Sequence, residues 1–180
     1  MNRNKQAYFA GGCFWCTEAI YKKLYGVINV TPGYSGGSLR NPTYKEVCTG
    51  NTGHAESIKI DYDPEQISFK VLVEIFFSTH DPTTLNRQGN DVGTHYRSAI
   101  FFNDLNEKNI AQAYIKKLHI GIYKSAKIVT ELKEFEIFYE AEDYHKNYFE
   151  LNKVQPYCDM VIAPKVEKFK KIYKERLKKD

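Results

Sequence analysis

The spacing of hydrophobic and polar residues along this 180-residue chain predicts a mixed α/β protein. Short apolar runs are typical of strands, and they occur at Ala7–Ala10, Val27–Val30, Glu56–Tyr62, Arg97–Phe102, Lys127–Leu132 and Phe135–Tyr139. Apolar residues at helical spacing predict helices at Cys13–Tyr25, Ser68–Ser78, Asp104–Leu118, Asp143–Leu151 and Lys165–Lys178. We expect the first helix to stop at Gly26.

Two stretches, Thr31–Asn41 and His80–His95, follow neither period and are rich in Gly, Pro, Asn and Thr. A long ordered loop in a compact protein is usually functional. No internal repeat or low-complexity linker divides the chain, and a chain of this length can bury about 70% of its unfolded surface in one domain. We therefore expect a single domain over residues 1–180, of the α/β (α+β) class.

Positive charge is concentrated at the C-terminal end. The net charge is +4, and residues 165–180 contribute eight basic and three acidic side chains, a local +5. Apolar residues recur there at helical spacing, which predicts a basic helix over about 165–178 with a solvated outer face. No basic stripe elsewhere extends this face, so we expect no nucleic-acid partner. A basic-tailed binding module is the non-enzymatic alternative.

The composition favours a cytoplasmic protein. Four cysteines in 180 residues are too few for a disulfide-stapled secreted scaffold. Residues 1–6 are polar, which predicts no signal peptide, and no apolar run approaches membrane-spanning length. We expect a monomer without membrane association.

The most informative motif is Cys13-Phe14-Trp15-Cys16-Thr17, which follows Gly11-Gly12 where a strand passes into a helix. The helix N-terminus would favour a thiolate at Cys13, and hence redox or nucleophilic chemistry. An inert buried cysteine and half of a zinc site are the blander interpretations. Cys48 and Cys158 are isolated, however, and the histidines lack metal-ligand spacing, so we expect no metal. The Cys13-x-x-Cys16 pair also fits a general thiol–disulfide oxidoreductase, which is the alternative enzyme.

Glu56 shares one face of its predicted strand with Ile58 and Ile60, whereas Lys59 and Asp61 lie on the other face. A carboxyl on an apolar face either pairs with a cation or has its pKa raised by desolvation. A raised pKa is what a general acid near neutral pH requires.

The second loop is dense in turn residues and hydrogen-bonding side chains, and it enters a strand near Tyr96. Such a loop, with Asp91 and Tyr96 in it, predicts the wall of a polar pocket. The five histidines are expected to be structural hydrogen-bonding residues rather than catalysts.

Seven short motifs, taken together and in order, resemble one family. They are Gly12–Trp15, Gly33–Gly37, Thr52–Glu56, His80–Thr83, Gln88–Gly93, Tyr96–Ser98 and Ala141–His145. Each is weak alone, but at this spacing they resemble the A-type peptide methionine sulfoxide reductases from about Gly11 to Lys165. The resemblance implies a two-layer catalytic domain with a ferredoxin-like mixed-sheet core and long ordered loops. It also implies reduction of methionine S-sulfoxide, free or in proteins.

Matching positions imply a role for each site residue. Cys13 would attack the sulfoxide sulfur, and Glu56 would protonate the sulfoxide oxygen. Tyr44 and Tyr96 would hydrogen-bond that oxygen, and Asp91 would organise the site through water. A thiolate and a neutral acid are both required, because sulfoxide sulfur is a poor electrophile until its oxygen is hydrogen-bonded or protonated.

The resemblance also implies a substrate contact and a recycling route. Phe14 and Trp15 would hold the methyl group of the substrate. After methionine leaves, Cys13 would remain as a sulfenic acid, which a second thiol resolves to a disulfide. Thioredoxin, or dithiothreitol in vitro, would reduce that disulfide without any bound cofactor.

The resolving thiol is Cys16 or Cys158. The family usually has Gly at position 16 and a glycine-rich tail with recycling cysteines, whereas this chain has Tyr157-Cys158 and then a basic helix. An i,i+3 pair in a helix has Cα atoms about 5–5.5 Å apart, within disulfide reach, so we favour Cys16 over Cys158. Cys48 is expected to be structural, on a short helix opened by Asn41-Pro42-Thr43.

Overall fold

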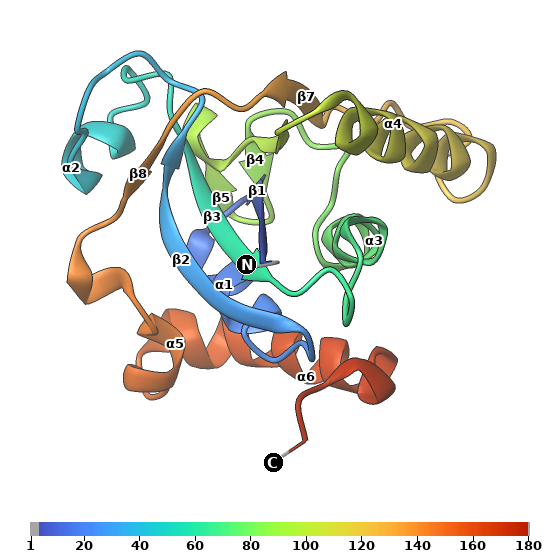
Figure 1. Cartoon of the computed structure of the whole chain (residues 1–180). Helices are drawn as coiled ribbons and strands as arrows, with labels where there is room; N and C mark the ends of the chain where they lie inside the picture. Colours follow the sequence, from blue (N-terminus) through green and yellow to red (C-terminus); the bar gives the residue numbers. More distant parts are fainter. Residues whose placement is uncertain (1–3, 180) are drawn as a thin grey trace.

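A six-stranded sheet with the order β7-β6-β1-β3-β2-β8 lies at the centre of the molecule (Figure 1). The computed structural model describes residues 4–179, so residues 1–3 of the polar N-terminal stretch and Asp180 of the basic segment lie outside the described range. The strands are β1 (Lys5–Gly11), β2 (Val27–Ser35), β3 (Ala55–Tyr62), β6 (Ser98–Phe102), β7 (Glu131–Glu134) and β8 (Phe138–Glu140). Neighbouring strands are antiparallel, except that β6 and β7 are parallel. The predicted mixed α/β class is therefore confirmed.

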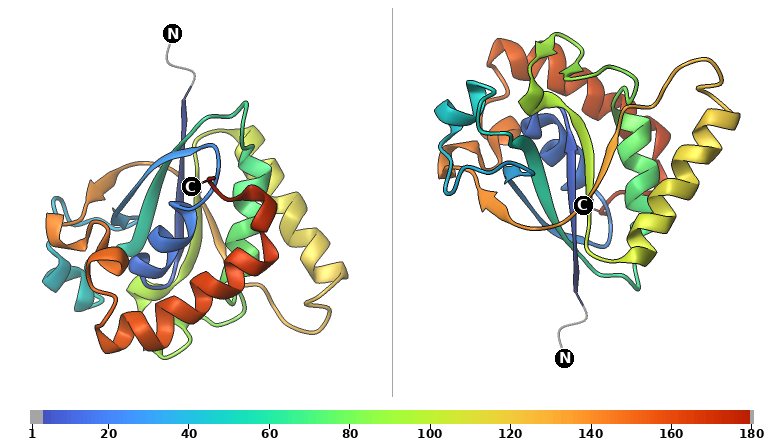
Figure 2. Two further views of the ribbon diagram at one scale, coloured as in Figure 1. Left: turned by 90° about the horizontal axis from the view of Figure 1, so that it is seen from below. Right: turned by 90° about the horizontal axis from the view of Figure 1, so that it is seen from above.

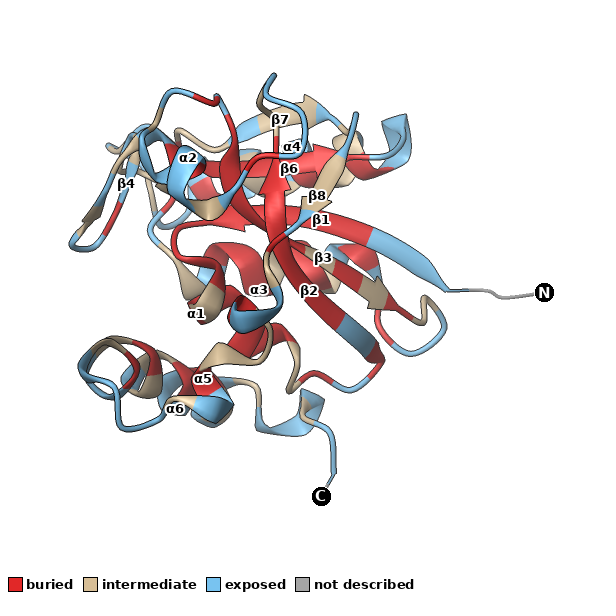
Figure 3. Ribbon diagram, turned by 90° about the vertical axis from the view of Figure 1, so that its left-hand side faces the viewer, coloured by how far each residue is buried: buried red, intermediate tan, exposed pale blue. Residues whose placement is uncertain are grey.

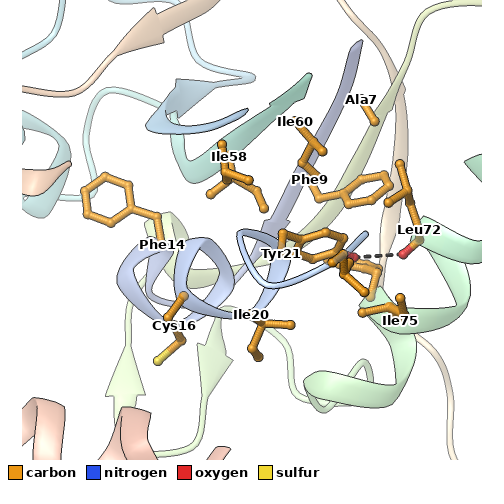
Figure 4. Close-up of a cluster of buried hydrophobic side chains, with 14 of the residues drawn as sticks. Ala7, Phe9, Phe14, Cys16, Ile20, Tyr21, Ile58, Ile60, Leu72 and Ile75 are labelled. Carbon is orange, nitrogen blue, oxygen red and sulfur yellow. Dashed lines mark hydrogen bonds between the residues drawn. The ribbon is translucent and has the colours of Figure 1, made fainter. Parts of the chain in front are cut away.

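The helices cover one face of this sheet. They are α1 (Phe14–Tyr21), α2 (Tyr44–Cys48), α3 (Phe69–Thr79), α4 (Leu105–Ile120), α5 (Tyr148–Leu151) and α6 (Ala163–Ile172). Phe9 of β1 contacts Tyr21 of α1 and Phe76 of α3, and the Tyr21 hydroxyl donates a hydrogen bond to the Leu72 carbonyl of α3 at 2.8 Å (Figure 4). Figure 2 shows α3 and α4 side by side on one flank, and α6 crossing beside α1.

The opposite face of the sheet is covered by irregular chain rather than by a helix. Tyr8, Ala10 and Phe101 form a smaller buried cluster there, against which Phe135 and Phe138 pack. The rings of Tyr8 and Phe135 stack with centroids 3.8 Å apart. The two-layer arrangement therefore holds, with the central strands buried over most of their length (Figure 3).

Two predicted helices are shorter in the structure, because tertiary hydrogen bonds replace helical ones. The first helix stops at Tyr21, since the Tyr25 amide donates to the Arg176 carbonyl at 2.8 Å. Gly26, with φ of +86°, therefore turns the chain into β2 rather than capping the helix. The predicted helix 143–151 is broken at Asn147, which has a φ of +58°, and leaves only α5 as α-helix.

The C-terminal helix also differs from its predicted range of 165–178. A π-helical segment, Cys158–Ile162, leads directly into α6, which ends at Ile172 and is followed by a 3₁₀ turn at Lys174–Arg176. None of the helices among residues 4–179 is both long enough and apolar enough to cross a membrane.

The remaining differences concern the sheet edges and the two loops. The strands predicted at 127–132 and 135–139 lie at 131–134 and 138–140, because residues before 131 are held by loop contacts such as Val129 N–H to the Pro82 carbonyl at 2.8 Å. Residues 31–35 extend β2 instead of forming a loop. The second loop contains a hairpin, β4 (Arg87–Gln88) and β5 (Asp91–Val92).

Candidate active site

The turn between β1 and α1 places Cys13 at the start of the helix. Gly12 has a φ of +91°, and a Cβ there would lie 2.6 Å from the Gln88 side chain, so only glycine fits. Cys13 is the N-cap residue of α1 and is 7% exposed. Cys16 follows one turn later and is 4% exposed, so both thiols are largely buried.

The pKa values of the two thiols are shifted in opposite directions. Burial raises the pKa of Cys13, and its hydrogen bond with Cys16 and the negative charge of Glu56 raise it further. The same hydrogen bond lowers the pKa of Cys16, helped by Lys165 and by the Tyr157 hydroxyl. The prediction of a Cys13 thiolate is thus wrong for the substrate-free protein, because burial outweighs the helix N-terminus. The Phe14 amide, the first N–H of α1, instead donates to Glu56.

β3 carries Glu56 on the helix-covered face, as its alternation predicts. The carboxyl is 1% exposed, and its Oε2 accepts a hydrogen bond from the Phe14 amide at 3.0 Å. Burial, reinforced by the charges of Asp91 and Cys16, raises the pKa of Glu56 to about 8. The carboxyl therefore holds its proton at neutral pH.

Two phenols gather around this carboxyl. Burial and the nearby charge of Glu56 raise the pKa of Tyr44 and of Tyr96, so both remain hydrogen-bond donors. Tyr44 begins α2, the short helix predicted after Pro42, and Thr43 and Glu46 form its capping box. Tyr96 ends a 3₁₀ turn, Thr94–Tyr96, just after β5.

Asp91 contacts Tyr157, a residue for which the sequence predicted no role. The Tyr157 hydroxyl donates a hydrogen bond to Asp91 Oδ2 at 2.6 Å. The same hydroxyl lies close to the thiol pair and lowers the pKa of both Cys13 and Cys16. Tyr157 thus connects the second loop to the thiol pair, and its only signal in the sequence is its position next to Cys158.

Aromatic rings form the wall beside the thiols. Trp15 stacks on Tyr148 with centroids 3.8 Å apart, and its Nε1 donates a hydrogen bond to His145 Nδ1 at 3.0 Å. Phe14 is buried between Tyr44 and His145. The Trp15 ring is therefore held in one orientation by α5 and by His145.

The histidines follow the prediction in part. His54, His80 and His145 make hydrogen bonds to backbone or side-chain partners. His95 Nδ1 and the second ring nitrogen of His145, Nε2, are buried and have no hydrogen-bond partner among residues 4–179.

One group of side chains could hold a metal ion. Cys48, Glu56 and His95 each place a ligand atom within 4.8 Å of the others, a group that sequence spacing could not reveal. Glu56 and His95 of this group are buried, whereas Cys48 is exposed.

The other two cysteines lie in different surroundings. Cys48, expected to be structural, is exposed at the end of α2. Cys158 is fully buried in the π-helical segment, and its pKa is raised by burial and then by the charge of Cys16.

Known proteins share both the sequence and the fold of this chain. Residues 5–177 match the family model described as peptide methionine sulfoxide reductase. Peptide methionine sulfoxide reductase MsrA of Saccharolobus solfataricus is 55% identical over 172 residues, which are 96% of this chain and 96% of that protein. The corresponding protein of Picrophilus torridus is 58% identical over 161 residues, or 89% of this chain and 90% of that protein.

Solved structures agree with these relatives. Methionine sulfoxide reductase A of Corynebacterium diphtheriae superposes with a TM-score of 0.76 at 36% identity, covering 86% of this chain and 78% of that one. The crystal structure of Mxr1 from Saccharomyces cerevisiae in reduced form gives a TM-score of 0.78 at 33% identity, covering 87% of this chain and 90% of that one.

Proposed function

The chain belongs to the peptide methionine sulfoxide reductase family and is an oxidoreductase that reduces methionine sulfoxide to methionine, and we propose that Cys13 is its nucleophile. In the first step Cys13 sulfur attacks the sulfoxide sulfur, and Glu56 donates its proton to the sulfoxide oxygen. Oxygen is transferred to Cys13 as a sulfenic acid, and methionine leaves. The proton lost by the Cys13 thiol replaces the one that Glu56 donates, so no net proton is consumed.

The observation that supports this proposal best is the hydrogen bond from the Phe14 amide to Glu56. It holds a protonated, 1% exposed carboxyl against the turn that presents Cys13. A fixed neutral acid beside a thiol is what activation of a sulfoxide requires. The general thiol–disulfide oxidoreductase would leave Glu56, Tyr44 and Tyr96 without a role.

The remaining site residues complete the step. Tyr44 and Tyr96 donate hydrogen bonds to the sulfoxide oxygen, and Asp91, held by Tyr157, orders the water between them. Phe14 and Trp15 contact the substrate methyl group, and Trp15 is the more accessible of the two rings. The preference for the S epimer rests on the resemblance to the family.

Cys16 is proposed as the resolving residue, with Cys158 as the alternative. Cys16 lies one helical turn from Cys13 and hydrogen-bonds with it, whereas the thiol of Cys158 is fully buried with a raised pKa. The resulting disulfide would be reduced by thioredoxin, or by dithiothreitol in vitro, with no bound cofactor. A cycle that returns to free thiols requires a reducing compartment, so we place it in the cytoplasm.

The whole chain, residues 1–180, is proposed to act as one catalytic domain and as a monomer, on free and protein-bound methionine S-sulfoxide. Neither nucleic acid nor a membrane is part of this function. The test is one turnover of the fully reduced enzyme without external reductant, followed by peptide mapping. We expect one methionine per enzyme and a Cys13–Cys16 disulfide. Insulin reduction without any sulfoxide turnover would instead establish the general oxidoreductase.

A further inference from the structure

The C-terminal helix brings a positive charge to the second thiol. Lys165 Nζ lies 4.0 Å from Cys16 Sγ, and Cys16 itself is 4% exposed. The ion pairs among residues 4–179 do not include Lys165, so no carboxylate neutralises this ammonium group there. A half-buried ammonium group that lies beside a thiol, rather than beside a carboxylate, can act on the ionisation of that thiol.

The π-helical segment explains how this contact arises. Tyr157 and Lys165 are eight residues apart, which in a regular α-helix would place them about 80° apart around the axis. The backbone hydrogen bond of a π-helical turn spans one residue more than that of an α-helical turn, so such a turn acts as a one-residue insertion in the helix. The separation across Cys158–Ile162 therefore acts like seven residues, which brings the two side chains to within about 20° of each other. The Tyr157 hydroxyl and the Lys165 ammonium group consequently both face α1.

Cys16 is surrounded by groups of both signs. The Cys13 thiol donates a hydrogen bond toward it, Lys165 adds the positive charge, and the Tyr157 hydroxyl lies beside it, so the pKa of Cys16 is lowered despite burial. Asp91, from β5, opposes this shift. Glu56 on β3 and Cys158 on the π-helical segment also interact with its charge. Lys165 is the one cation in this set. Figure 4 shows the Cys16 sulfur on the side of α1 away from Ile58.

We propose that Lys165 is a positioning residue that holds the Cys16 sulfur in its anionic form, ready to attack the Cys13 sulfenic acid. This inference rests on the proposed function and identifies a residue that controls its second step, the attack of Cys16 on the Cys13 sulfenic acid. In that step Cys16 sulfur bonds to Cys13 sulfur, and the sulfur–oxygen bond of the sulfenic acid breaks. The oxygen leaves as water after taking a proton from solvent, so the sulfenic sulfur is reduced and Cys16 is oxidised.

The test measures the rate of disulfide formation in a single turnover across a range of pH. Reduced enzyme is mixed with methionine S-sulfoxide and no reductant, quenched with acid, and mapped for the Cys13–Cys16 bond. Lys165→Met removes the charge and keeps the aliphatic stem, Lys165→Arg restores a charge, and Lys168→Met removes an exposed charge from the same helix. We expect Lys165→Met to form the disulfide about ten- to hundred-fold more slowly at pH 7, with a profile shifted to higher pH. Lys165→Arg and Lys168→Met should remain close to wild type.

The amount of methionine released separates this proposal from the proposed function. All variants should still release one methionine per enzyme, which also shows that they are folded. Wild-type rate and pH profile in Lys165→Met would overturn the role of Lys165, and so would an equal defect in Lys165→Arg. Absence of methionine release from the wild-type enzyme would instead overturn the proposed function.

Discussion

Glu56→Gln should separate proton donation from hydrogen bonding. A glutamine fits the same space, can accept the Phe14 amide through its carbonyl, and can donate a hydrogen bond to the sulfoxide oxygen, but it has no proton to transfer. General acid catalysis of this kind contributes about 10²–10⁴-fold, so sulfenic acid formation should slow by that factor, equivalent to about 3–5 kcal/mol of transition-state stabilisation. With a pKa of about 8, Glu56 is about 90% protonated at pH 7. The wild-type first step should therefore fall above pH 8, and the variant should lack this decrease.

The same substitution should change the pH dependence of stability. The pKa of Glu56 is raised from 4.5 to about 8 in the folded protein, so between these values the native state keeps a proton that the unfolded chain releases. Stability from this group is fully present below pH 4.5 and decreases as pH rises, by at most about 1.4 kcal/mol per pH unit. Between pH 6 and pH 8 the wild-type protein should lose about 2 kcal/mol from this source. Glu56→Gln should lose none of it.

Two assays check this reasoning. A quenched single-turnover measurement of methionine release gives the rate of the first step in both proteins from pH 6 to pH 9. Urea unfolding at pH 6 and pH 8 gives the two free energies of unfolding. A near-normal single-turnover rate in Glu56→Gln would remove Glu56 from the mechanism. Equal pH dependence of stability in the two proteins would refute the raised pKa.

Two further predictions concern recycling and the fold. Cys16→Ser should still release one methionine per enzyme but should lose thioredoxin-supported cycling. Cys158→Ser should keep that cycling. The opposite pattern in a coupled thioredoxin assay would make Cys158 the resolving residue. Gly33→Ala should destabilise the protein by about 1–3 kcal/mol in thermal or urea unfolding, because its Cβ would lie 2.3 Å from both the Phe138 ring and the Tyr139 carbonyl of β8. An unchanged midpoint would show that β8 can move away from β2 at little cost.

The sequence predicted what depends on local periodicity and missed what depends on distant contacts. The alternation of β3 placed Glu56 on the buried face, and the Gly12 turn placed Cys13 at a helix start. The acidity of Cys13 was mispredicted because burial, which distant parts of the chain produce, raises its pKa. The shifted edge strands also result from distant contacts. Hydrogen bonding of Val129 to the loop residue Pro82, rather than the alternation of side chains, determines where β7 begins.

The C-terminal residues of the site were missed for a different reason. Tyr157 and Lys165 share one helix face only because a π-helical segment lies between them. A period of 3.6 residues places them on different faces, so a search for helical patterns cannot pair them. The resemblance to a family also gave no help here, because it marked Tyr157-Cys158 as a recycling segment and gave Tyr157 no role of its own.

The central claim is that Cys13 accepts the oxygen of methionine sulfoxide. The most direct test is the turnover of methionine S-sulfoxide by Cys13→Ser with dithiothreitol in excess, so that recycling by Cys16 or Cys158 is not limiting. We predict no methionine above the uncatalysed background, because neither of the other buried thiols lies at the turn beside Glu56. Appreciable turnover by Cys13→Ser would contradict it.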